Sequence, residues 1–255
     1  MPRYRIDCAY HGAAFSGWQR QPGQRTVQSV LELWLGRILG QPGGIDVTGA
    51  GRTDAGVHAE LMVAHFDVDQ PIDAVAVCHR LRAALPDDIV VKAIRPVDSD
   101  FHARYRAIGR TYEYRVQFTA SPFGRDRWWF VPETIDVTVL EACAESVMGR
   151  HDFRGFCLAE SQRSDNHCTV FESHWSQDGT RLIYRISADR FLHEMVRLIV
   201  GTMVDAARGR FDAERVAEII SSADVRLCGT AAPPHGLTLV SVSYPGDADS
   251  AGETG

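Results

Sequence analysis

One loop of the sequence brings an acid, a base and three glycines together within a few residues. It reads Thr48-Gly49-Ala50-Gly51-Arg52-Thr53-Asp54-Ala55-Gly56-Val57-His58-Ala59. Glycines lack a Cβ, so they let the backbone approach a ligand closely and adopt positive φ angles. A carboxylate such as that of Asp54 acts as a nucleophile only when it is ionised, and a nearby arginine favours that form. The loop is therefore the first candidate for a reactive site.

The same loop fits three other interpretations. Gly49-Ala50-Gly51 is similar to a dinucleotide-binding turn, but Asp54 stands where the third glycine would be, and a second strand follows instead of a helix. Asp54-Ala55-Gly56 is similar to the aspartic protease triplet, which needs a second carboxylate. A dimer could supply that carboxylate, but the usual apolar residues before the triplet are missing. A plain hairpin turn, with Asp54 capping its own backbone, is the structural alternative.

Composition excludes several classes of protein. The chain has 255 residues, 45% hydrophobic and 24% charged, which is typical of one large globular domain or two intertwined halves. Its formal charge of −6 argues against a histone-like polycation. No apolar run approaches the ~20 residues of a membrane span, and the first residues contain no apolar signal core. We therefore expect a cytoplasmic protein without a membrane segment.

The cysteines and cations favour a reducing compartment and phosphate recognition. The six cysteines are scattered without a CxxC pair, which favours free thiols over a disulfide framework. Cys157, His167, Cys168 and His174 lie in one stretch, but their spacing fits no standard zinc pattern, so we expect no metal. Lys92 is the only lysine, and the arginines that supply the remaining positive charge suit phosphates and base faces.

Apolar periodicity divides the chain into two similar halves. The first half predicts strands at 4–9, 45–48, 61–68 and 89–94, and helices at 27–38 and 72–84. The second half predicts strands at 110–118, 170–177, 181–188 and 237–244, and helices after 136, over 191–204 and after 212. Each half reads β-α-β-β-α-β. We expect an α+β fold of two ferredoxin-like halves, 1–98 and 99–245, sharing a mixed, mostly antiparallel sheet. Helices would cover one face, a catalytic cleft would lie on the other, and 246–255 would be a disordered tail.

Further motifs accompany the loop along the chain. They are Phe15-Ser16-Gly17-Trp18-Gln19-Arg20-Gln21, Leu85-Pro86-Asp87-Asp88-Ile89, Phe101-His102-Ala103-Arg104, Arg110-Thr111-Tyr112-Glu113-Tyr114, His151-Asp152-Phe153, Phe191-Leu192 with Met195-Val196-Arg197 and Gly201, and Gly236-Leu237. With the Asp54 loop, they resemble the TruA family of tRNA pseudouridine synthases over nearly the whole chain. The resemblance implies a cofactor-free isomerisation of uridine in the anticodon stem-loop of tRNA, at tRNA positions 38 to 40, by a homodimer.

The resemblance assigns the central chemistry to three residues. Asp54 is the nucleophile or ribose-directed carboxylate, Arg197 is its charge partner, and Tyr112 packs on the target base. A phenol ring can stack on uracil while its hydroxyl bonds or relays a proton. This chain departs from the family pattern at Glu194 and Leu198, where histidine and asparagine are usual, so no substrate contact is carried over to Glu194.

Four more residues are expected to bind the substrate. Arg52 matches the family arginine that helps to turn the nucleotide out of its stack, which costs a few kcal/mol. Leu237 matches the apolar residue under the uracil, and His58 belongs to the loop motif that is specific for the family. Arg20, in the first long loop, is a candidate for a phosphate contact.

The middle of the chain is locally basic and aromatic, which favours RNA. Seven arginines between residues 95 and 127 face four acids, a local excess of +3, and Trp128 and Trp129 follow directly. Two other functions stay open at this point. One is a non-enzymatic tRNA-binding protein, for which Asp54 would be dispensable. The other is a hydrolase that pairs Asp54 with Asp67 or Asp69.

Overall fold

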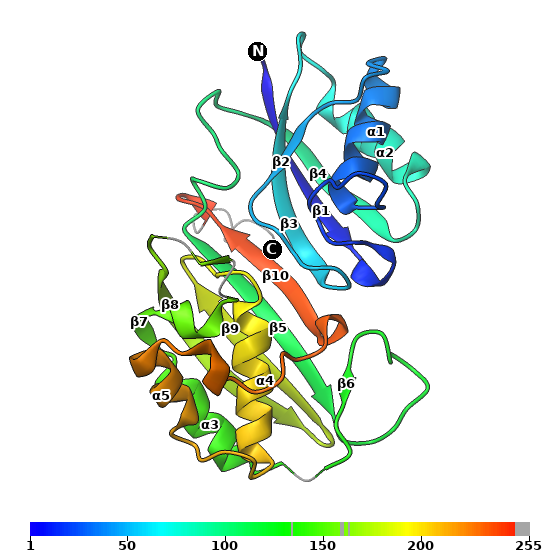
Figure 1. Ribbon diagram of the computed structural model, residues 1–255. Coiled ribbons are helices and arrows are strands. Elements are labelled where there is room, and N and C mark those ends of the chain that lie inside the picture. Colours follow the sequence, from blue (N-terminus) through cyan, green and yellow to red (C-terminus); the bar gives the residue numbers. More distant parts are fainter. Residues whose placement is uncertain (134, 159–160, 163, 248–255) are drawn as a thin grey trace. The chain divides into compact units, whose positions relative to one another are not determined.

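The computed structural model describes residues 1–133, 135–158, 161–162 and 164–247, and the chain divides into two compact units (Figure 1). The first unit comprises Met1–Ile108 and the chain from Leu239 onward, and the second comprises Gly109–Thr238. The first unit thus extends beyond residue 98, because Ala103 donates its N–H to His65 Nδ1 and accepts from the Tyr244 hydroxyl. From residue 248 onward, the tail expected at 246–255 lies outside the described residues.

The first unit has the predicted β-α-β-β-α-β order. Its elements are β1 (Arg3–Tyr10), α1 (Val27–Leu39), β2 (Val47–Gly49), β3 (His58–Asp67), α2 (Ala74–Ala84) and β4 (Ile89–Val97). Strand β1 pairs antiparallel with both β3 and β4, and β2 pairs antiparallel with β3. The order β4-β1-β3-β2 is the ferredoxin-like arrangement that the sequence predicted.

Local sequence signals fix both helices of this unit. Thr26 and Ser29 form a reciprocal capping box at the start of α1, and Gly40 ends the helix with φ of 71°. The Asp73 side chain accepts from Ala76 N at the start of α2. The two helices pack against each other (Figure 1).

Strand β1 shows that the two faces of this sheet differ in polarity. Tyr4, Ile6 and Cys8 alternate along the strand and are almost fully buried. The intervening residues include Arg5 and Asp7, which form an ion pair at 2.6 Å. One face therefore supplies the apolar core, whereas the charges on the other face neutralise each other in an ion pair.

The second unit is also built from antiparallel strands and helices. It comprises β5 (Gly109–Gln117), β6 (Trp129–Phe130), α3 (Val137–Ser146), β7 (Gly149–Asp152), β8 (His167–Asp178), β9 (Arg181–Ala188), α4 (Met195–Ala207) and α5 (Arg215–Ser222). Its strands run in the order β5-β9-β8-β7, and the short β6 pairs parallel with β5. The chain then enters β10 (Leu237–Ser243), which crosses the boundary between the units. The α+β, mostly antiparallel fold class is confirmed.

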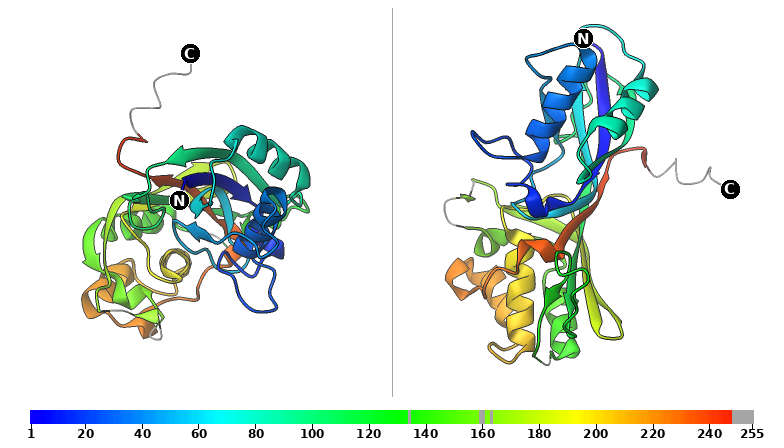
Figure 2. Two further views of the ribbon diagram at one scale, coloured as in Figure 1. Left: turned by 90° about the horizontal axis from the view of Figure 1, so that it is seen from above. Right: turned by 90° about the vertical axis from the view of Figure 1, so that its right-hand side faces the viewer.

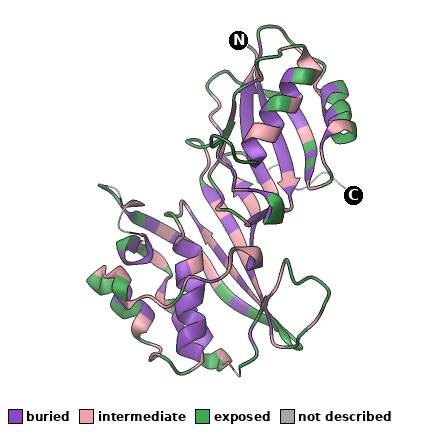
Figure 3. Ribbon diagram, turned by 45° about the vertical axis from the view of Figure 1, so that its right-hand side comes forward, coloured by how far each residue is buried: buried purple, intermediate pink, exposed green. Residues whose placement is uncertain are grey.

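Helix α4 supplies much of the core of the second unit. Almost all of its residues are buried (Figure 3), and α4 and α5 stand on one side of the β8–β9 hairpin in the right-hand view of Figure 2. The sequence predicted a helix from Phe191, but α4 begins at Met195. Glu194 has φ of 59°, in the left-handed region, and a right-handed helix cannot continue through that conformation. None of the helices in the described part of the chain has the length and apolarity needed to cross a membrane.

We predict a pH dependence of stability from His65 on β3. Burial lowers the pKa of His65 to about 4, assisted by the positive charge of Arg3. The unfolded chain has the ordinary value of 6.5, so it binds the proton more readily between pH 6.5 and 4. The stability contribution of neutral His65 is fully present above pH 6.5 and is lost as the pH falls towards 4, by up to ~1.4 kcal/mol per pH unit.

The measurement is urea unfolding followed by tryptophan fluorescence at several pH values. In His65→Asn, the amide oxygen can still accept from Ala103 N but does not titrate. The gap in unfolding free energy between wild type and this variant should shift in favour of the variant as the pH drops below 6.5. A gap that stays constant from pH 7 to pH 4.5 would contradict the assignment.

Candidate active site

The Asp54 loop connects β2 to β3 and is tied to the neighbouring segment on both sides of Asp54. Trp18 N donates to Thr53 O at 3.1 Å, and Gly56 N donates to Phe15 O at 3.3 Å. A turn bond of 3.2 Å runs from Val57 N to Asp54 O. Asp54 itself is half-buried. The loop therefore holds its carboxylate in a place set by main-chain hydrogen bonds.

Close packing around Thr53 stiffens the same loop. The Tyr10 hydroxyl lies 2.8 Å from Thr53 Oγ1, and both residues are buried. The Trp18 ring is 1% exposed and lies against Gly49, where a Cβ would come within 2.6 Å of the ring. Gly49 is thus needed for its small size, which gives one of the glycines in the motif a structural reason.

His58, expected to bind substrate, makes contacts inside the protein. It is 2% exposed, its Nδ1 accepts from Gly12 N at 3.0 Å, and its ring lies 4.5 Å from that of His11. These contacts anchor the end of the Asp54 loop to the end of β1. Arg52, by contrast, is exposed on the loop, where a ligand can reach it.

Arg20 neutralises a buried acid. Its guanidinium lies 2.9 Å from Glu32, whose side chain is 7% exposed, and 3.5 Å from the exposed Asp46. Glu32 also accepts from Gln28 Nε2 and from Val47 N, which joins α1 to β2. Because the Arg20 side chain is 58% exposed, a phosphate contact stays a prediction for it.

In the second unit, Tyr112 stands on β5 opposite Ile186 of β9. Its ring is half-buried and packs nearly perpendicular to that of Phe191, at a centroid separation of 5.2 Å. Phe191 precedes α4, which begins at Met195. This residue therefore lies outside the helix and packs against Tyr112. An aromatic ring braced in this way can present a flat face to a base.

Arg197 lies in the first turn of α4 and is held at two points. Its Nε donates to Ala232 O at 2.8 Å, and Nη1 lies 2.6 Å from the Glu194 carboxylate. The side chain is only 14% exposed. The guanidinium is therefore oriented by a carbonyl on one side and a carboxylate on the other.

Tyr114 links Arg197 to Leu237, and the sequence singled it out only as a neighbour of Tyr112. Its hydroxyl donates to Pro233 O at 2.7 Å, next to the Ala232 carbonyl that Arg197 uses. Burial raises the pKa of the Tyr114 phenol well above its ordinary value, while the charge of Arg197 opposes that rise. Gly236 packs so closely on the ring that a Cβ would meet it at 2.6 Å, and the buried Leu237 follows. In the sequence, the motif Gly236-Leu237, which comes after two prolines, was the signal that marked this segment.

The predicted site residues therefore fall into two groups, one in each unit of the chain. The first unit carries the Asp54 loop with Arg52, His58 and the neighbouring Arg20, and the second carries Tyr112, Arg197 and Leu237. Within the second unit, Tyr114 and the segment 232–236 bring Arg197 and Leu237 into one cluster.

The arginines of the basic stretch are more fully paired than their number suggests. Arg95 contacts Asp7 at 3.2 Å, Arg106 contacts Asp100 at 3.2 Å and Arg115 contacts Glu113 at 3.2 Å. Trp129 packs edge-on against Tyr114, with a centroid separation of 6.0 Å. The local excess of positive charge therefore overstates how many arginines are available to a ligand, because several of these guanidinium groups form ion pairs within the protein.

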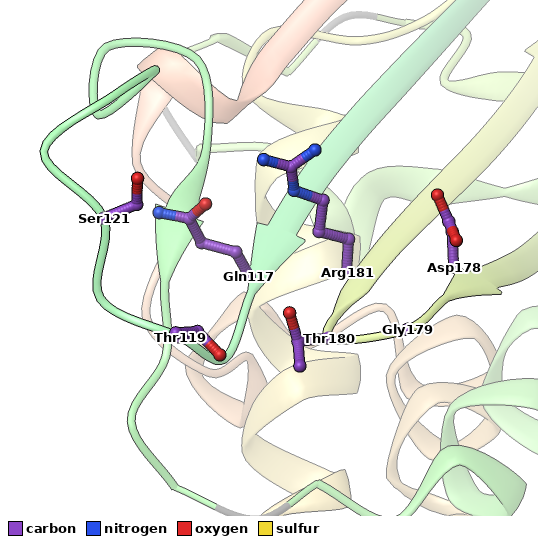
Figure 4. A pocket seen from close by; sticks show the side chains of 7 residues that line it. All are labelled: Gln117, Thr119, Ser121, Asp178, Gly179, Thr180 and Arg181. Carbon is purple, nitrogen blue, oxygen red and sulfur yellow. The ribbon is translucent and has the colours of Figure 1, made fainter.

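Other candidate sites carry less chemistry. Among the described residues, no group of three or more His, Cys, Asp or Glu side chains is arranged to hold a metal. All six cysteines are free, and five of them are buried. A hollow at the β8–β9 turn is lined by polar side chains including Gln117, Asp178 and Arg181, and it contains none of the predicted site residues (Figure 4).

The paired-carboxylate hydrolase is contradicted by the first unit. Asp67 ends β3, whereas the Asp54 loop precedes its start at His58, so a ten-residue strand separates them. At ~3.3 Å per residue, roughly 30 Å lie between the two ends of that strand. Asp67 is instead paired with Arg3 at 2.8 Å, and Asp69 lies further along the chain.

Comparisons with known proteins show which family the chain belongs to. The model of a family described as tRNA pseudouridine synthase matches residues 8–106 and 143–245. The chain is 38% identical over 245 residues to tRNA pseudouridine synthase A of Exiguobacterium sibiricum, covering 96% of this chain and 98% of that protein. It is 41% identical over 254 residues to tRNA pseudouridine synthase A of Methylobacterium nodulans, covering 98% and 99%. The chain belongs to this family of pseudouridine synthases.

We predict that Gly12 is needed to hold the Asp54 loop. A Cβ at this position would lie 2.1 Å from Val57 O and 2.9 Å from the Gly56 carbonyl carbon, so Gly12→Ala must push the end of the loop away. The expected cost is about 1–3 kcal/mol in unfolding free energy, together with loss of turnover. Gly51→Ala is the control, because nothing lies within 4 Å of its Cβ. Equal unfolding midpoints for the two variants in thermal melts would refute this account.

Proposed function

We propose that this chain isomerises uridine to pseudouridine in the anticodon stem-loop of tRNA, at positions 38 to 40. The observation that carries the proposal is the Asp54 loop, in which main-chain bonds to Phe15 and Trp18 hold a carboxylate between two tethered residues. Membership of the pseudouridine synthase family and the full-length similarity to proteins named tRNA pseudouridine synthase A support it.

The reaction conserves every atom and needs no redox partner. The bond between N1 of uracil and C1′ of ribose breaks, the base rotates, and C5 bonds to C1′. The proton on C5 is lost and N1 gains one, so the product is an isomer of the substrate. Asp54 serves this sequence as an ionised carboxylate, either by attacking C1′ or by taking a ribose proton to form a glycal.

The second unit supplies groups suited to hold the base and the charge. Tyr112, braced by Phe191, stacks on the uracil, and the buried Leu237 contributes an apolar surface beneath it. Arg197 is the charge partner of Asp54, as the family resemblance implies. On the first unit, the exposed Arg52 occupies the gap that the extruded nucleotide leaves.

The working form that we propose is a cytoplasmic homodimer bound to tRNA. The dimer is what the resemblance to the family implies. Sedimentation velocity at micromolar concentration should give a species near twice the chain mass of 28.3 kDa. A monomer that forms pseudouridine at the full rate would overturn the dimer proposal and leave the activity standing.

The decisive experiment replaces Asp54 by asparagine, which keeps the shape and removes the charge. We expect pseudouridine formation to fall by roughly 10³-fold or more, while the tRNA dissociation constant changes little. Product is mapped by carbodiimide-stop sequencing of unmodified tRNA, and affinity is measured by filter binding. Asp69→Asn, an exposed acid outside the loop, is the matched control and should keep full activity.

The other outcomes separate the alternatives. A wild-type chain that binds tRNA without forming pseudouridine would support a tRNA-binding protein. Release of free uracil would indicate hydrolysis. A large loss of affinity in Asp54→Asn would make Asp54 a structural residue.

A further inference from the structure

Glu194 departs from the family pattern and has a rare backbone conformation. Its φ is 59° and its ψ is 2°, and Ala223 is the only other non-glycine residue with positive φ in the described part of the chain. A side chain with a Cβ is disfavoured in this region. Such a conformation persists only where the surrounding structure holds it, and such residues often lie at functional sites.

Glu194 also departs from the usual chemistry of its position. It is the N-cap of α4, where Ser, Thr, Asp or Asn would normally accept from the first backbone N–H groups. Its side chain makes no capping bond. The carboxylate instead lies 2.6 Å from Nη1 of Arg197, so the start of this helix has an ion pair in place of a side-chain cap.

The pair lies where solvent is limited. The Glu194 and Arg197 side chains are 21% and 14% exposed, so their attraction is screened less than that of a surface pair. On the other side, Arg197 Nε donates to Ala232 O, and Ala232 N donates to Arg197 O at 3.0 Å. Two N–H groups on different edges of the guanidinium are thereby engaged, which fixes its plane and the directions of its other N–H groups.

We propose that Glu194 is a positioning residue, whose left-handed backbone and ion pair hold Arg197 in the orientation that its role toward Asp54 requires. This inference rests on the proposed function, in which Arg197 is the charge partner of Asp54. Without the carboxylate, the guanidinium loses the contact at Nη1 that, together with the bond from Nε to Ala232 O, sets its plane. The productive orientation then occupies a fraction of the population, which lowers kcat without weakening tRNA binding.

Two substitutions separate the hydrogen bond from the backbone conformation. In Glu194→Gln, the amide oxygen can accept the same bond from Nη1, so kcat should stay within about threefold of wild type. In Glu194→Asn, the residue tolerates positive φ but its side chain is too short to reach Nη1. We expect its kcat for pseudouridine formation to fall roughly tenfold or more, with KM for tRNA unchanged. Glu194→Gly, which also fits the backbone, replaces the asparagine variant if that variant does not fold.

A double variant tests whether Glu194 acts through Arg197. In an Arg197→Lys background, Glu194→Asn should add less than about a twofold loss, because the group that it positions is gone. Full kcat in Glu194→Asn, or an equal loss in both backgrounds, would overturn the inference. Full kcat in Arg197→Lys would instead refute the role proposed for Arg197. A wild-type chain without product would refute the proposed function itself.

Discussion

The arrangement of the first unit depends on one constraint, the close backbone contact between the Asp54 loop and the segment 12–18. The bond from Trp18 N to Thr53 O is possible only because Gly12, Gly17 and Gly49 carry no side chain where the two segments meet. Hydrogen bonds between main-chain atoms cannot be rearranged by choosing another rotamer, so they hold the loop more rigidly than side-chain contacts would. A nucleophile gains from this rigidity, because its reactive oxygen has to remain within a narrow range of positions.

The second unit reaches the same end through buried side chains. Tyr114 extends from β5 into the core and binds the backbone at Pro233, while Arg197 binds at the adjacent Ala232. The segment 232–236 thus receives contacts from Tyr114 on a strand and Arg197 on a helix, two residues that are more than 80 positions apart in the chain. Gly236 closes the arrangement, since its contact with the Tyr114 ring leaves no space for a Cβ.

Sequence reasoning predicted the elements of the fold well, because apolar periodicity and caps such as Thr26 are local signals. The three glycines singled out the Asp54 loop, but its catalytic role followed only from the resemblance of the accompanying motifs to a known family, and it stays a prediction. The start of α4 could not be predicted, since the apolar pattern begins at Phe191 and only the left-handed backbone at Glu194 prevents the helix from starting before Met195. The pairing of Arg95 and Arg115 was also missed, because a count of charges does not reveal that Arg95 pairs with Asp7 on the neighbouring strand and Arg115 with Glu113 on its own strand.

The buried cysteines can report local opening of the folded chain. Burial raises the pKa of Cys143 to about 11 and that of Cys168 to about 12, and Cys8 and Cys78 are enclosed in the first unit. Thiolate is the form that reacts with alkylating reagents, so burial limits access to these thiols, and in Cys143 and Cys168 it also favours the unreactive protonated form. The rate of alkylation at each cysteine therefore reports local opening around it. The opening of the two units can be measured separately in a single sample, without any added label.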